Sequence, residues 1–127
     1  PYTFLSTEVV RYQSEEAAAS ARKELLMRSD ECLRKGGGVT PNGVFAKYSF
    51  MPLPGNSVPI LTTADRVSMY TAIGEGTEKR FLLSFFHYSK NTFVGIYIIK
   101  ASASFTDSEL RQWMIIADAL SKRTTTT

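Results

Sequence analysis

The segment from Arg80 to Leu120 constrains the fold most, because two apolar runs, a short turn and a helix start follow one another there. Aromatic and branched residues dominate Phe81 to Tyr88 and Thr92 to Lys100, and Ser89-Lys90-Asn91 separates the two runs as a hairpin turn does. The sequence therefore predicts an antiparallel hairpin that leads into a helix.

The start of that helix carries its own signal. Thr106 is followed three residues later by Glu109, so the two side chains can each accept a hydrogen bond from the other's backbone amide. Phe105, just before this capping box, can pack on Leu110. We therefore expect a helix after Thr106, with Trp113 on its buried face.

The first half of the chain predicts three strands and one more helix. Gly36-Gly37-Gly38 should end the helix, because glycine accepts the left-handed conformation of a helix C-cap. The expected elements are a strand over Glu8 to Tyr12 that Tyr2, Phe4 and Leu5 can extend, a helix capped by Ser14 and reaching about Leu33, and strands over Val44 to Met51 and Arg66 to Ile73.

These elements predict one α+β domain over residues 1–123, followed by a disordered tail over Thr124 to Thr127. A chain of 127 residues suits one domain with a true core. The order is strand, helix, four strands, helix. Because short links join the four successive strands, we expect an antiparallel, meandering sheet with both helices packed on one face.

Few residues offer catalytic or metal-binding chemistry. His87 is the only histidine and Cys32 the only cysteine, and no motif places a nucleophile beside the histidine. Cys32 falls on the apolar stripe of the first helix, so we expect a buried, unreactive thiol. We predict no enzyme activity, no cofactor and no metal site. A net charge of +3 gives no reason to expect a nucleic-acid partner, and no apolar window is long enough to span a membrane.

Aromatic strands and one irregular loop provide the candidate binding residues. The hairpin carries large side chains on both faces, which is more than two helices on a single face can cover. Prolines interrupt the segment Met51 to Thr63, so we expect a loop beside this surface. The candidates are Tyr48, Phe50, Arg66, Tyr70, Phe86 and Tyr97. Arg66 or, as the alternative, Lys47 would bind an anionic head group of the ligand.

Four patterns resemble the small extracytoplasmic domains of actinobacterial lipoproteins and receptor-kinase sensor regions. They are Thr7-Glu8-Val9-Val10-Arg11-Tyr12 with Ser14-Glu15-Glu16-Ala17 and the helix that ends near Cys32, Ala64-Asp65-Arg66-Val67 at a strand start, the hairpin from Phe85 to Ile98, and the closing helix from Leu110 to Arg123. Many such domains carry a pair of cysteines, whereas this chain has Cys32 alone.

The resemblance implies a non-enzymatic ligand-sensing or protein-interaction domain outside the cytoplasm, secreted or lipid-anchored. Its partner would be a small apolar or cell-envelope ligand, or a protein. Two alternatives remain open: a cytoplasmic interaction module of the immunity-protein type, and a small hydrolase that uses His87. The chain begins at Pro1 rather than Met, which is compatible with a mature product or a trimmed chain that has lost a signal peptide or anchor.

Overall fold

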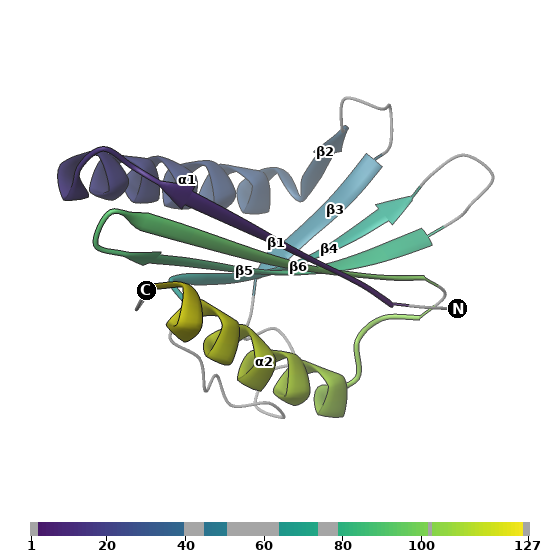
Figure 1. The fold of residues 1–127 in the computed structure, drawn as a ribbon. Coiled ribbons are helices and arrows are strands. Elements are labelled where there is room, and N and C mark those ends of the chain that lie inside the picture. The colour runs from purple at the N-terminus through teal and green to yellow at the C-terminus, as the bar shows by residue number, and fades with distance from the viewer. Residues whose placement is uncertain (1–2, 40–44, 51–63, 74–78, 102, 126–127) are drawn as a thin grey trace.

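The computed structural model describes residues 3–39, 45–50, 64–73, 79–101 and 103–125. This part of the chain forms one sheet and two long helices (Figure 1). In chain order the elements are β1 (Thr3–Arg11), α1 (Glu15–Lys35), β2 (Gly37–Val39), β3 (Phe45–Phe50), β4 (Arg66–Ile73), β5 (Lys79–Ser89), β6 (Thr92–Ala101) and α2 (Asp107–Thr125).

The described strands form a six-stranded antiparallel sheet in the order β1-β6-β5-β4-β3-β2. Strands β2 to β6 follow one another as a meander. Strand β1 joins the far edge, where Thr3 pairs with Lys100 and Arg11 with Thr92 in an unbroken register. The α+β class and the antiparallel sheet are therefore confirmed, and β1 lies at one edge beside the last strand.

One face of the sheet packs against α2 and holds the main core. Leu83 and Phe85 of β5 and Ile96 of β6 are almost fully buried there, as are Leu110 and Met114 of α2. Trp113 packs against this cluster but is only partly buried. The same cluster also contains Val67, Val94, Ile98, Phe105 and Ala117.

The opposite face lies under α1. Figure 1 shows α1 on one side of the sheet and α2 on the other. Phe86 and Phe93 alternate onto the α1 face and are 8% and 5% exposed, and Ala18 of α1 is 1% exposed. Neither phenylalanine belongs to the core cluster of α2. The domain therefore buries apolar side chains in two layers, one on each face.

This arrangement corrects the expectation that both helices pack on one face. Residues of the β5–β6 hairpin are large and apolar on both faces, so each face needs its own cover. One helix on each side of the sheet covers both apolar faces. The surplus of exposed aromatic surface that we expected on the hairpin is thus absent from its described part, where Phe85 and Phe86 are both buried.

A second correction concerns the glycine run. Gly36 has a φ of 72° and follows the last residue of α1, as a C-cap glycine should. Gly37 and Gly38 do not continue into a turn, because they pair with Lys47 and Ala46 as part of the short strand β2. The sheet therefore has one strand more than the sequence predicted.

The local signals of the closing helix are confirmed. The amide of Glu109 donates to Thr106 Oγ1 at 3.1 Å, and the amide of Thr106 donates to Glu109 Oε1 at 2.9 Å. Phe105 and Leu110 are both buried in the core cluster. The helix continues to Thr125, two residues into the expected tail, and the last two residues of the chain lie outside the described part.

The cap of the first helix and the turn of the hairpin are also formed by the expected residues. Ser14 Oγ accepts a hydrogen bond from the amide of Ala17 at 3.0 Å, which caps α1. Lys90 and Asn91 form the β5–β6 turn, and Lys90 adopts a positive φ of 53°. The Asn91 side chain donates to the carbonyl of Tyr12, while the Tyr12 amide donates to the Asn91 carbonyl. The turn thus anchors the end of β1.

Replacing Glu109 by Gln should destabilise the domain by about 1 kcal/mol at neutral pH, because it weakens the capping box and an ion pair with Lys100 at 2.8 Å. The hydrogen bond from Lys100, followed by that from the Thr106 amide, lowers the pKa of Glu109 below 4.5. A carboxylate with a lowered pKa stabilises the fold above its unfolded pKa and loses this effect as the pH falls through its folded pKa. Urea unfolding at several pH values measures this effect. The difference in unfolding free energy between wild type and Glu109→Gln should shrink below about pH 4.5.

A gap that stays constant between neutral and acidic pH would contradict this role for the Glu109 charge. Glu24→Gln serves as the control, because Glu24 pairs with Arg28 on the exposed side of α1 and should contribute little.

Candidate functional site

The structure brings two of the six candidate residues into one aromatic layer under α1. Phe86 and Tyr97 are described in full, and their ring centroids lie 5.9 Å apart in an edge-to-face contact. Phe86 stacks on Phe93 at 6.0 Å, Phe93 contacts Tyr88 at 4.7 Å, and Tyr88 contacts Tyr12 at 6.4 Å. Phe86 is therefore part of the packed interior, while Tyr97, Tyr88 and Tyr12 are only partly buried.

Tyr97 is fixed at the rim of this layer by three contacts. Its hydroxyl donates to Glu8 Oε1 of β1 at 2.9 Å, and its ring packs edge-on against Phe86. The ring also covers Gly95, where an added Cβ would lie 2.5 Å from the Tyr97 hydroxyl oxygen. Burial, and then the bond to Glu8, raise the pKa of Tyr97, so it stays a neutral hydrogen-bond donor.

The other four candidates occupy neighbouring positions in the sheet. Arg66 pairs with Phe86, Tyr48 pairs with Tyr70, and Phe50 pairs with Ser68. In register these positions alternate onto the same face as Phe86 and Tyr97. The structure does not describe the side chains of these four residues or that of Lys47. The expected loop from Met51 to Thr63 also lies outside the described residues.

Asp65 forms a polar link that the sequence analysis missed. Its Oδ1 accepts a hydrogen bond from Arg22 Nε of α1 at 2.9 Å, and its Oδ2 accepts one from the Tyr88 amide at 2.7 Å. The Asp65 amide donates to the Phe86 carbonyl at 2.8 Å. Asp65 therefore ties the middle of α1 to β5. No local motif marks a pair that is 43 residues apart in the sequence.

The sheet and the length of α1 separate Cys32 from His87. His87 pairs with Val94 and alternates onto the α2 face, whereas Cys32 lies in α1 on the other side. Arg22, which reaches the Tyr88 amide through Asp65, precedes Cys32 by ten helical residues, or about 15 Å. The two residues that the hydrolase alternative could have combined are thus not brought together. The side chain of Cys32 is outside the described part, so its expected burial stays a prediction.

Charged residues of the described structure form no metal centre. No group of three or more His, Cys, Asp or Glu side chains comes together in this part of the chain. A shallow depression on the exposed side of α1 has a mixed charged lining, in which Arg28 pairs with Glu24 at 2.8 Å. Its residues are Glu24, Met27, Arg28, Asp30, Glu31 and Arg34. Because acidic and basic side chains neutralise one another here, the depression has no single charge with which to attract a ligand.

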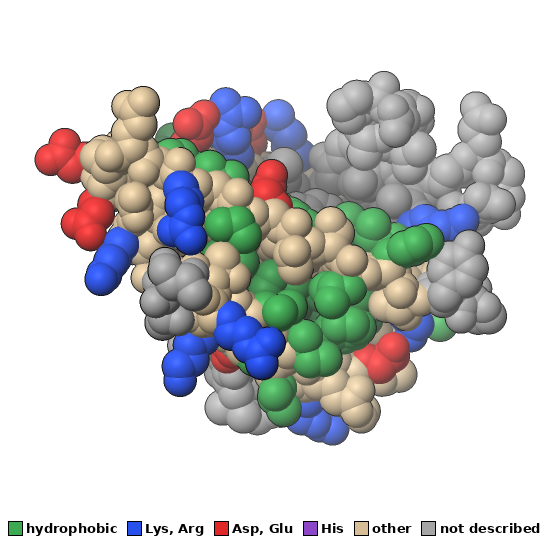
Figure 2. Space-filling model, viewed as in Figure 1, with side chains coloured by type: hydrophobic (Ala, Val, Ile, Leu, Met, Phe, Trp, Pro, Cys, Tyr) green, Lys and Arg blue, Asp and Glu red, His purple; other side chains and the backbone are tan. Residues whose placement is uncertain are grey.

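Exposed apolar side chains gather instead along β1 and the side of α2 next to it. Phe4, Leu5 and Val9 of β1 are 58%, 47% and 46% exposed, and Ile116 of α2 is 40% exposed. Figure 2 shows hydrophobic side chains concentrated between these two elements. We call this surface, formed by Leu5, Val9, Trp113 and Ile116 on the α2 face and by Phe4 on the opposite face of β1, the apolar edge.

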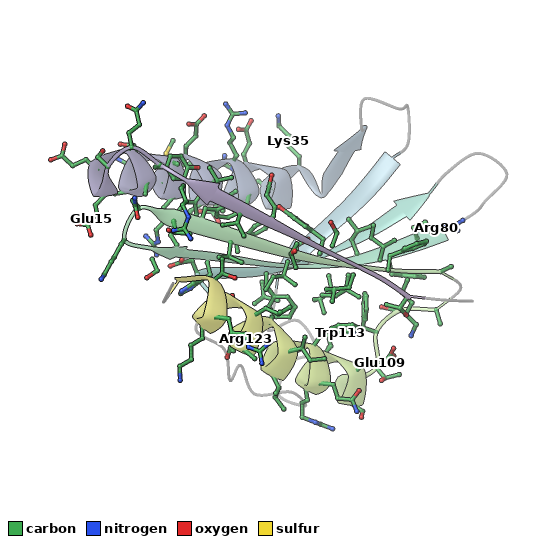
Figure 3. The ribbon with its side chains drawn as sticks, viewed as in Figure 1. Glu15, Lys35, Arg80, Glu109, Trp113 and Arg123 are labelled. Atoms are coloured by element: carbon green, nitrogen blue, oxygen red, sulfur yellow. The ribbon has the colours of Figure 1, made fainter. Side chains whose placement is uncertain are left out.

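Helical spacing places three residues of α2 on one side of that helix. Glu109 forms its ion pair with Lys100 of β6, which lies between Thr3 of β1 and Phe81 of β5. Trp113 and Ile116 follow Glu109 at helical spacings of four and seven residues, so they lie on that same side of α2. Figure 3 shows Glu109 and Trp113 in the part of α2 that lies nearest the start of β1. The sequence analysis missed this surface because an edge position cannot be read from local pattern.

No described helix has the length and apolarity needed to cross a lipid bilayer. No family model, no curated protein and no solved structure matches this chain.

Proposed function

We propose that this chain is a non-catalytic protein-interaction domain that binds an extended segment of a partner protein along the apolar edge. One observation carries the proposal. Strand β1 is a regular nine-residue edge strand with three large apolar side chains between 46% and 58% exposed, and no described strand pairs with its outer side. Such an edge offers backbone hydrogen bonds and apolar contacts at the same time.

The neighbouring helix supports this proposal. Leu5 and Val9 pair with Ile98 and Val94, which α2 buries, so the apolar surface continues from the core outward to the edge. Ile116 extends it onto α2. Large apolar patches at the border of a core are typical of surfaces that a partner covers.

Sensing of a small apolar or cell-envelope ligand is the second candidate. The half-buried Tyr97 and the common face of the six candidate positions favour it. Long-chain fatty acid is a suitable probe, and saturable binding that Tyr97→Ala abolishes would support this reading over the first. Binding that does not depend on Tyr97 would argue against it.

An extracytoplasmic location is part of the proposal through the resemblance to sensor and lipoprotein domains. The coding sequence upstream of Pro1 tests it. A signal peptide or lipobox would support export, whereas an in-frame start without either would favour the cytoplasmic interaction module.

A fluorescent peptide with the sequence of residues 3–11 tests the binding surface. We expect saturable binding to the folded domain, measured by anisotropy at a low protein concentration, because the peptide can add to the edge as a strand. The double variant Leu5→Lys with Val9→Lys should bind at least about tenfold more weakly, since it places charge on the apolar edge. Ile115→Lys is the matched control, because Ile115 is 70% exposed on α2 but lies outside the apolar edge. Equal binding by all three proteins would contradict the proposal.

A further inference from the structure

We propose that the partner of the apolar edge is a second copy of this chain, bound through antiparallel pairing of β1 with β1 about a twofold axis at Thr7. This inference rests on the proposed function and identifies its partner. A twofold interface requires the same strand to be complementary to itself. Strand β1 meets this condition in one particular register.

The twofold axis at Thr7 places apolar side chains opposite apolar ones. Leu5 then faces Val9 of the second copy on the α2 side of the sheet, and Phe4 faces Val10 on the α1 side. The two Thr7 side chains face each other. Pairs of an aromatic and a β-branched side chain, and pairs of two threonines, are favourable across neighbouring strands. Phe4, Leu5 and Val9, which are 58%, 47% and 46% exposed, would each contact an apolar side chain of the second copy.

Charge excludes the neighbouring registers. In the Thr7 register Glu8 faces Ser6, a hydroxyl that can donate to its carboxylate. An axis at Glu8 would set the two Glu8 carboxylates opposite each other and Leu5 opposite Arg11. An axis at Ser6 would set Glu8 opposite Phe4. Both shifts bring a charge against a like charge or an apolar side chain, and each costs stability. The sequence of β1 therefore specifies the axis at Thr7.

Apart from the charges of Glu8 and Arg11, the strand lacks the features that usually prevent edge pairing. Proteins protect exposed edges with lysine, proline, bulges or short strands. Thr3–Arg11 contains no lysine and no proline, and its nine residues pair with β6 without a bulge. In the described part of the chain no strand occupies the outer side of this regular edge.

The helices extend the contact beyond the two strands. A twofold axis normal to the sheet keeps both copies of α2 on the same face, with their Trp113 and Ile116 sides turned toward each other. Leu5 and Val9 of both copies then form the floor between the helices. The twelve-stranded sheet that results would cover the apolar edge of each copy.

Analytical ultracentrifugation of the full chain tests the oligomeric state. We expect wild type and the control Ile115→Lys to sediment as dimers, and Leu5→Lys with Val9→Lys to sediment as a monomer. Because Leu5 and Val9 are about half exposed, this variant should keep the fold, and circular dichroism checks that. Wild-type protein that stays monomeric at all concentrations would overturn the inference.

Disulfide cross-linking tests the register independently of stability. In a Cys32→Ala background, Thr7→Cys should form a covalent dimer under mild oxidation, since the two residues face each other across the axis. Ser6→Cys and Glu8→Cys are the matched controls and should cross-link at least about tenfold more slowly, because each faces a different residue of the second copy. Faster cross-linking at either control position would overturn the Thr7 axis.

The two proposals fail in different ways. A monomeric protein whose edge still binds the peptide of residues 3–11 would overturn the dimer and leave the proposed function in place. A monomer that does not bind the peptide would overturn both.

Discussion

Replacing Phe85 by Ala should destabilise the domain by about 3 to 5 kcal/mol and lower its melting temperature by about 12 to 20 °C. Phe85 is 1% exposed and lies in the core cluster between the sheet and α2. Its loss removes buried aromatic surface and leaves a cavity that the surrounding strands cannot close. Thermal unfolding followed by circular dichroism measures the change.

Ile115→Ala is the control for this layer. Ile115 belongs to the same helix that covers Phe85, but it is 70% exposed, so its truncation should cost less than about 0.5 kcal/mol. Equal effects of the two substitutions would mean that α2 does not pack over this face of the sheet.

Replacing Phe86 by Ala should destabilise the domain by nearly as much, about 3 kcal/mol or more. Phe86 is the next residue along β5 and alternates onto the opposite face of the sheet. Phe86 is 8% exposed and contacts Phe93 and Tyr97 in the aromatic layer. Truncation of two successive strand residues is expected to cause large losses of stability at both positions only if a helix covers each face of the sheet. The same thermal unfolding experiment therefore tests the position of α1.

Met27→Ala is the control for the second layer, because Met27 is 61% exposed on α1 and its truncation should be nearly neutral. A cost below about 1 kcal/mol for Phe86→Ala would show that the α1 face is open, and it would restore the exposed aromatic surface that the sequence suggested.

Local chemistry explains which parts of the fold could be predicted. The capping box of Thr106 and Glu109, the cap at Ser14 and the turn at Lys90 and Asn91 each depend on residues within a few positions of one another. Strand β4 begins at Arg66 and ends at Ile73, as predicted. These features were readable because their hydrogen bonds form within one turn or one hairpin.

Long-range placement explains what was missed. Apolar residues on both faces of β5 already indicated burial on both sides, but we interpreted them as an exposed surface. The pairing of β1 with β6 and the Asp65 link to Arg22 join residues that are distant in sequence, so no local pattern could reveal them. The candidate site was predicted from aromatic residues on strands beside an expected loop, which could not distinguish the buried Phe86 from the half-buried Tyr97.

The pairing of the first strand with the last has a consequence during synthesis. Arg11 and Thr92 are 81 positions apart and Glu8 and Tyr97 are 89 apart, so β1 leaves the ribosome long before its partner strand exists. At ordinary elongation rates of about 5 to 20 residues per second this delay is roughly 4 to 18 s. Throughout that interval both edges of Thr3–Arg11 are unpaired, and the nascent chain carries an apolar strand that waits for its last neighbour.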